Sequence, residues 1–150
     1  MGVEAMMAKS VRPLRRVILH HTASPLASTS VDDILRWHLQ RGMSGIGYHF
    51  VIAPDGLVHH TRWIQRVGAH TRGHNLDSVG VALIGDFERE QPTESQVGAL
   101  VRLLEDLKRE HGLSRLQLHG DLTATCCPGR NLRARVPLIV QRAGYNLAGE

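Results

Sequence analysis

The sequence has few of the features of a disulfide-bonded or membrane-spanning protein. Among its 150 residues are only two cysteines, Cys126 and Cys127, and they are adjacent. Adjacent cysteines are poorly placed for an unstrained disulfide, so we expect no disulfide framework; metal ligation or a reducing compartment fits better. No run of about 18 apolar residues occurs, so we expect no insertion into a membrane.

A large excess of one charge is also lacking, and no segment repeats at a fixed period. The formal net charge is only +4, and the basic residues are spread along the chain, so the sequence does not indicate a nucleic-acid partner. Apolar residues make up 42% and charged residues 21%, as in ordinary folded proteins. The length suits one domain, which we predict over residues 15–150 after an N-terminal extension over residues 1–14.

Hydrophobic periodicity predicts an α/β fold with a central mixed β-sheet flanked by helices. Short apolar runs predict strands over residues 17–19, 48–52, 57–59, 79–85 and 116–118. The strands at 48–52 and 57–59 are predicted to form a hairpin around the turn at 54–56, and the apolar run at 79–85 is predicted to lie centrally in the sheet. Helical spacing predicts helices over residues 31–40 and 93–110, and a last helix within 131–141 that Pro137 interrupts or starts. Ser30 and Thr93 stand where N-caps are expected, and Gly112 marks the end of the longest helix.

Three residues offer the ligands that a zinc ion prefers. His119 and Cys127 are eight residues apart across a predicted loop, and His20 lies at the end of a predicted strand. Three protein ligands leave a fourth position for water, whose pKa the metal lowers, so hydrolysis is the natural reaction class. The chain has ten histidines and therefore many other possible triads, so spacing alone leaves this assignment open.

A series of short motifs follows in order along the chain. They are ILHHTAS at 18–24, RWH at 36–38, GYHF at 47–50, VGAHT at 67–71, Asn75, SVGV at 78–81, and the stretch from His119 to CPG at 127–129. In this order they resemble the zinc-dependent N-acetylmuramoyl-L-alanine amidases, a family that includes small phage lysozyme-amidases and animal peptidoglycan recognition proteins. The resemblance spans residues 17–132, and the ordered set is far more specific than any one motif.

The resemblance implies that Zn²⁺ is held by His20, His119 and Cys127. It selects Cys127 over Cys126 because the family's ligand directly precedes Pro-Gly, and we expect Cys126 to pack inward. His21 adjoins a ligand, but consecutive side chains of a strand point to opposite faces, so we expect a structural role for His21.

Catalytic and substrate-binding residues are carried over in the same way. The family's catalytic tyrosine falls on Tyr48, and Thr125 falls where the family places a Lys or Thr that stabilises the oxyanion. His70 matches a histidine bordering the substrate groove, and Asn75 lies in the same loop. Arg72 flanks this region, and its guanidinium suits bidentate binding of a stem-peptide carboxylate.

The implied activity is hydrolysis of the amide bond between the lactyl group of N-acetylmuramic acid and L-Ala of the stem peptide in peptidoglycan. We expect a monomeric phage or prophage endolysin that binds peptidoglycan or muropeptides. Residues 1–10 contain no apolar export segment, so we expect it to stay in the cytoplasm and reach the cell wall after release. Two alternatives remain open: a non-catalytic muropeptide-binding module, and a metal-free hydrolase with Cys127 as nucleophile and His119 as base.

Overall fold

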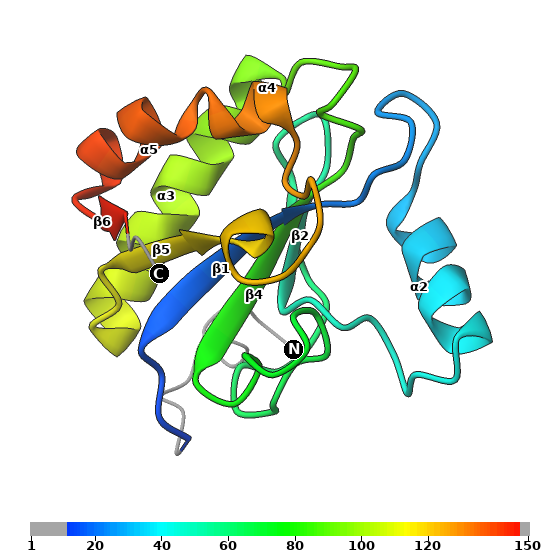
Figure 1. Ribbon diagram of the computed structural model, residues 1–150, viewed down its shortest axis with the longest axis horizontal. Helices are drawn as coiled ribbons and strands as arrows, with labels where there is room; N and C mark the ends of the chain where they lie inside the picture. The colour runs from blue at the N-terminus through cyan, green and yellow to red at the C-terminus, as the bar shows by residue number, and fades with distance from the viewer. Residues whose placement is uncertain (1–11, 148–150) are drawn as a thin grey trace.

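The computed structural model describes residues 12–147. The strands are β1 (Arg16–His21), β2 (Phe50–Ile52), β3 (Val58–His60), β4 (Ser78–Leu83), β5 (Arg115–Leu118) and β6 (Asn146–Leu147). The helices are α2 (Val31–Gln40), α3 (Glu94–His111), α4 (Arg130–Arg133) and α5 (Val136–Ala143), with a 3-10 turn η1 at His119–Asp121. Figure 1 shows one central sheet with helices packed around it, which confirms the predicted fold class.

The sheet is mixed, and its strand order is β3-β2-β4-β1-β5-β6. Strands β2, β4, β1 and β5 run parallel, and β3 pairs antiparallel with β2 as the predicted hairpin. The apolar run predicted as a central strand forms β4, which is buried along its whole length. Parallel strands end at the same edge of a sheet, so the residues that follow β1 and β5 meet there.

The two faces of the sheet carry separate apolar cores. Ile52 belongs to a large core shared with α3 and α5, whereas Val51 packs with Ile34 of α2. Because successive side chains in a strand point to opposite faces, α3 and α2 cover opposite faces of the sheet. Leu19 of β1 belongs to the large core. His20 therefore points to the face that α2 covers.

Capping residues set the ends of the two long helices as the sequence predicts. Ser30 forms a capping box with Asp33 at the start of α2, and Thr93 forms one with Gln96 at the start of α3. Gly112 ends α3 in the left-handed conformation, at φ 70°.

The C-terminal helical region is divided near Pro137, as the sequence predicts. It forms the two short helices α4 and α5, because Pro137 at the start of α5 has no amide hydrogen and cannot continue the helix that precedes it. Strand β6, which pairs with β5, was not predicted; a two-residue strand has no periodicity to detect.

Most of the predicted N-terminal extension lies outside the described residues. Arg12, within its described part, donates to the carbonyl oxygens of Ile64 at 2.9 Å, Leu76 at 3.0 Å and Ser78 at 3.0 Å. These bonds attach the chain before β1 to the segment before β4. The boundary at residue 14 remains a prediction.

Gln96 joins α3 to the sheet. Its buried side chain accepts from Thr93 N–H at 3.0 Å and donates to the carbonyls of Ile84 at 2.8 Å and Ile52 at 3.3 Å. We expect Gln96→Leu to lower the free energy of unfolding by about 2–4 kcal/mol, because it leaves these buried groups unpaired. The midpoint of thermal unfolding then falls by roughly 5–15 °C. A similar loss in Gln91→Leu, at an exposed position, would contradict this explanation.

Candidate metal centre and active-site cavity

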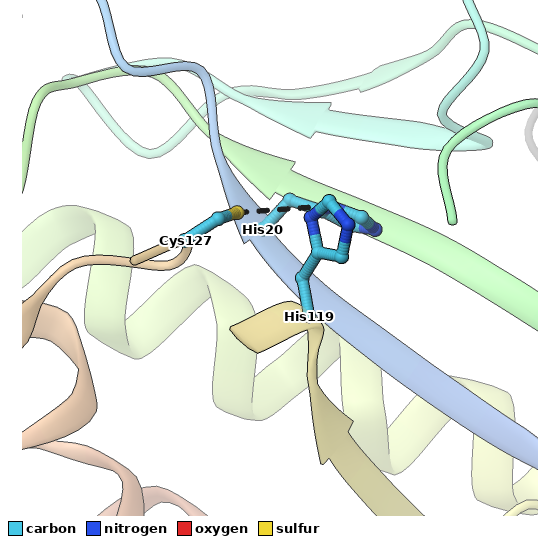
Figure 2. Close-up of side chains that lie close together, drawn as sticks. All are labelled: His20, His119 and Cys127. Carbon is cyan, nitrogen blue, oxygen red and sulfur yellow. Dashed lines mark hydrogen bonds between the residues drawn. The ribbon is translucent and has the colours of Figure 1, made fainter. Parts of the chain in front are cut away.

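Strand register brings two of the predicted ligands together. Leu19 of β1 pairs with Leu118 of β5, so His20 and His119 follow at the same level of the sheet edge. Their ring centroids are 4.6 Å apart. Figure 2 shows the His119 side chain rising from the end of β5 toward His20 on β1.

The third predicted ligand returns to this edge through the loop after η1. Gly120 N–H donates to the carbonyl of Cys127 at 2.7 Å, which closes the loop. A Cβ at Gly120 would lie 2.6 Å from the carbonyl oxygen of Thr125, so only glycine permits this approach. The sulfur of Cys127 accepts from His21 N–H at 3.3 Å and lies 3.8 Å from His20 Nδ1.

The three side chains form a donor set that fits a metal ion. One ligand atom from each of His20, His119 and Cys127 lies within 4.8 Å of the others. Nδ1 of His119 is buried and has no hydrogen-bond partner among the described residues, as expected for an atom that binds a cation. Two imidazoles and one thiolate are ligands that zinc prefers. The cluster can therefore hold a metal.

Burial shifts the pKa values of two members of this cluster when no ion is bound. It lowers the pKa of His20 well below its usual value, which keeps the imidazole neutral and able to bind a metal. It raises the pKa of the Cys127 thiol to about 12. A buried thiol with this pKa is a poor nucleophile at neutral pH, whereas an adjacent cation would favour the thiolate.

Tyr48 stands beside the cluster, two residues before β2. Its ring centroid lies 5.1 Å from that of His20 and 5.5 Å from that of His38. His38 Nδ1 accepts from Gly47 N–H at 3.0 Å, so α2 holds the backbone next to Tyr48. Burial raises the pKa of Tyr48, which leaves its hydroxyl protonated as a donor. His38 belongs to the RWH motif but had no predicted role; its position four residues after the apolar Ile34 was the available signal.

A cavity of about 290 Å³ opens at this cluster. Besides the three candidate ligands, Tyr48, Thr125 and His70 contribute to its lining. Thr125 is exposed, and its hydroxyl oxygen accepts from Cys127 N–H at 3.3 Å, so its hydrogen is free to point elsewhere. The expectation that Cys126 packs inward is wrong: it is exposed on the cavity lining, because the neighbouring Cys127 side chain takes the inward position.

The predicted substrate-binding residues fall in different places. His70 lines the cavity, but its Nδ1 lies 2.8 Å from Nε2 of His20. Asn75 does not line this cavity; its Oδ1 accepts from the backbone N–H of His70 at 3.0 Å and of Thr71 at 2.9 Å. Arg72 is exposed and also lies outside the cavity lining. Substrate contacts by these three residues remain predictions.

His21 points away from His20, as strand alternation predicts. Its Nδ1 accepts from Phe87 N–H at 3.0 Å, and the side chain is 4% exposed. The bond joins the end of β1 to the loop after β4. His21 therefore has a structural partner that competes with metal ligation.

His49 lies next to His70, with ring centroids 6.0 Å apart, and its hydrogen bonds require a neutral ring. Its Nδ1 accepts from Gly80 N–H at 3.0 Å, and its Nε2 donates to the carbonyl of Arg66 at 2.8 Å. Burial, with smaller effects of nearby arginines, lowers its pKa from 6.5 to about 4. Between these values the unfolded chain binds a proton that the folded protein does not, so stability is full above pH 6.5 and falls as the pH decreases toward 4.

We expect the free energy of unfolding to fall by up to about 3 kcal/mol as the pH decreases from 6.5 to 4, because the unfolded chain gains a proton at His49. His49→Asn keeps an acceptor for Gly80 but removes the titration. Urea unfolding at several pH values should therefore show the difference between the original protein and the variant shrinking from pH 7 to pH 4.5. A difference that is independent of pH would refute the assignment.

Comparison with known proteins gives consistent matches over most of the chain. The family model described as N-acetylmuramoyl-L-alanine amidase matches residues 10–130. The endolysin of Klebsiella phage KP32 is 33% identical over 124 residues, which cover 79% of this chain and 82% of the phage protein.

Solved structures are similar too. The N-acetylmuramoyl-L-alanine amidase LysC from Clostridium intestinale URNW superposes with a TM-score of 0.77 at 33% identity, covering 85% of this chain and 86% of LysC. Peptidoglycan recognition protein-LE, in complex with tracheal cytotoxin (monomeric diaminopimelic acid-type peptidoglycan), gives a TM-score of 0.76 at 29% identity. That match covers 85% of this chain and 82% of the other.

Proposed function

This chain belongs to the N-acetylmuramoyl-L-alanine amidase family, and we propose that its activity depends on Zn²⁺ held by His20, His119 and Cys127. The chain is an enzyme of the phage-endolysin type that hydrolyses the amide bond between the lactyl group of N-acetylmuramic acid and the L-Ala of the stem peptide. The convergence of three ligand atoms within 4.8 Å at the cavity carries the metal proposal.

Zinc in such a site lowers the pKa of a water molecule and polarises a carbonyl oxygen. The protein's own groups act on the substrate carbonyl. The protonated hydroxyl of Tyr48 donates a hydrogen bond to the carbonyl oxygen as negative charge develops on it. Thr125 supplies a second hydroxyl at the cavity, with its oxygen oriented by Cys127 N–H. Water adds through its oxygen to the lactyl carbonyl carbon. The C–N bond then breaks with its electron pair going to nitrogen, and the protons given up by the water end on the leaving amine of L-Ala.

Two observations favour this mechanism over the alternatives. In a metal-free hydrolase Cys127 must be a thiolate, but burial raises the pKa of this thiol. A binding module needs no donor set for a metal, whereas His20, His119 and Cys127 are all retained and converge. We therefore place an active metalloenzyme ahead of both.

The same family supports a proposal for the substrate and for where the protein acts. A recognition protein of similar structure is known in complex with a monomeric peptidoglycan fragment, and we propose that a muropeptide or peptidoglycan strand occupies the cavity here. Among residues 12–147, no helix has the length and apolar character needed to cross a membrane. We propose a monomer that acts on the cell wall after release, as an endolysin does.

The proposal is tested by the release of L-Ala amino termini from purified peptidoglycan. The protein is assayed as isolated, after chelation, and after zinc is added back, with release of reducing sugar as the control for glycan cleavage. We expect loss of amino-terminal release with chelator and recovery with zinc. Activity that survives chelation would support the cysteine hydrolase, and no activity under any condition would support the binding module.

A further inference from the structure

A series of polar contacts leads from His20 through His70 to a backbone carbonyl. Nε2 of His20 lies 2.8 Å from Nδ1 of His70. Nε2 of His70 lies 3.4 Å from the hydroxyl of Ser78, which donates to the carbonyl of His74 at 2.7 Å. This series of contacts joins β1, the loop before β4 and the first residue of β4.

The carbonyl at the end of this series determines where each hydrogen lies. A carbonyl oxygen only accepts, so the Ser78 hydroxyl donates its hydrogen bond to the backbone carbonyl of His74. The Ser78 oxygen then accepts from Nε2–H of His70, which leaves Nδ1 of a neutral His70 ring without a hydrogen. That bare nitrogen accepts from Nε2–H of His20, and Nδ1 of His20 carries no hydrogen. One backbone carbonyl thereby selects the tautomer of both rings.

The nitrogen of His20 that is left bare is the one that faces the ligand cluster. His20 Nδ1 lies 3.8 Å from the sulfur of Cys127. We propose that His70 is a positioning residue, which accepts the Nε2 hydrogen of His20 and so holds Nδ1 of His20 unprotonated for the metal. This inference rests on the proposed metal site and deepens it. It assigns His70 a role in metal binding instead of the predicted contact with substrate.

The backbone around His70 is shaped to keep its ring in this position. A Cβ at Gly80 of β4 would lie 2.5 Å from the ring, and a Cβ at Gly68 would lie 2.7 Å from it. Both positions therefore give the imidazole space that any other residue would fill. Asn75 binds the backbone N–H of His70, and the hydroxyl of Thr71 lies 3.0 Å from His70 Nδ1. The two glycines leave room for the ring, and the contacts with Asn75 and Thr71 hold the residue next to His20.

Two substitutions of the same shape separate hydrogen bonding from packing. His70→Asn places an amide oxygen near the position of Nδ1. His70→Leu fills the same space but leaves His20 Nε2 with only the more distant hydroxyl of Thr71, at 3.3 Å. Zinc affinity is measured by competition with a chromophoric chelator. We expect a loss of about 10–100-fold for His70→Leu and a change within about threefold for His70→Asn. His59→Leu, at a histidine outside the cavity lining, controls for removal of an imidazole.

The tautomer is read directly in zinc-free protein. Long-range ¹H–¹⁵N correlation spectra at pH 7.5 should show His20 with the hydrogen on Nε2, retained in His70→Asn and mixed with the other tautomer in His70→Leu. A hydrogen on Nδ1 of His20 in the original protein would overturn the inference, as would equal losses of zinc affinity in the two variants. Failure of the original protein to bind zinc would instead refute the proposed function, and the zinc-free spectra would still report the tautomer.

Discussion

Replacing Cys127 with alanine is expected to abolish zinc binding and to lower the rate of L-Ala release by more than about a thousandfold. The thiolate is one of three protein ligands, so its loss leaves only His20 and His119 for the metal. Metal content of the purified variant and its amidase rate are measured on the same samples. The thermal unfolding midpoint shows whether the variant remains folded, since its buried sulfur also accepts from His21 N–H.

The adjacent cysteine provides the matched control for this substitution. Cys126 is exposed on the cavity lining, and we place it outside the metal cluster, so Cys126→Ala should keep both zinc and activity. Equal losses in the two variants would show that the ligand had been assigned to the wrong cysteine. A Cys127→Ala variant that keeps its zinc but loses all activity would show that Cys127 is not a metal ligand, and would support a role for its thiol as nucleophile.

Replacing Tyr48 with phenylalanine is expected to lower the amidase rate by about 10²–10³-fold while zinc affinity stays unchanged. The substitution removes one donor to the developing oxyanion but keeps the ring that packs beside His20 and His38. Burial raises the pKa of Tyr48, so the hydroxyl remains a donor across the neutral pH range. The kcat and the zinc dissociation constant are the quantities to compare, because a merely structural tyrosine would change the second as well.

The chain's other tyrosine is a control of the same chemistry. Tyr145 donates from its hydroxyl to the carbonyl of Leu104 at 2.7 Å and lies outside the cavity lining. Tyr145→Phe should lower the free energy of unfolding by about 1 kcal/mol and leave the amidase rate unchanged. If Tyr48→Phe had no more effect on the rate than Tyr145→Phe, Tyr48 would have no role in catalysis.

Local sequence patterns were sufficient to predict the starts of the two long helices and the central place of β4 in the sheet. The capping pairs Ser30 with Asp33 and Thr93 with Gln96 mark the starts of α2 and α3, because each pair satisfies amide groups within one turn of the helix. The apolar run of β4 indicated its central place, since a strand covered on both faces needs apolar residues throughout. Pro137 likewise indicated the interruption before α5 through its missing amide hydrogen, whereas strand β6 could not be predicted, because it exists only through pairing with β5.

The candidate metal ligands needed both kinds of information. Their residue types were suggestive, but ten histidines allow many triads, and the order of the family motifs was what selected His20, His119 and Cys127. The structure adds the register of β1 with β5 and the loop closed at Gly120, which bring these residues within reach of one ion.

By itself, the sequence determined the family, the fold class and the types of side chain available at the site. Tertiary structure alone decided which nitrogen of His20 faces Cys127, that Asn75 binds backbone, and that Cys126 is exposed. The reason is physical: hydrogen-bond partners and side-chain orientation come from segments brought together by strand pairing. His70 shows this most clearly, because it is fifty residues from His20 in sequence but 2.8 Å from it in the fold.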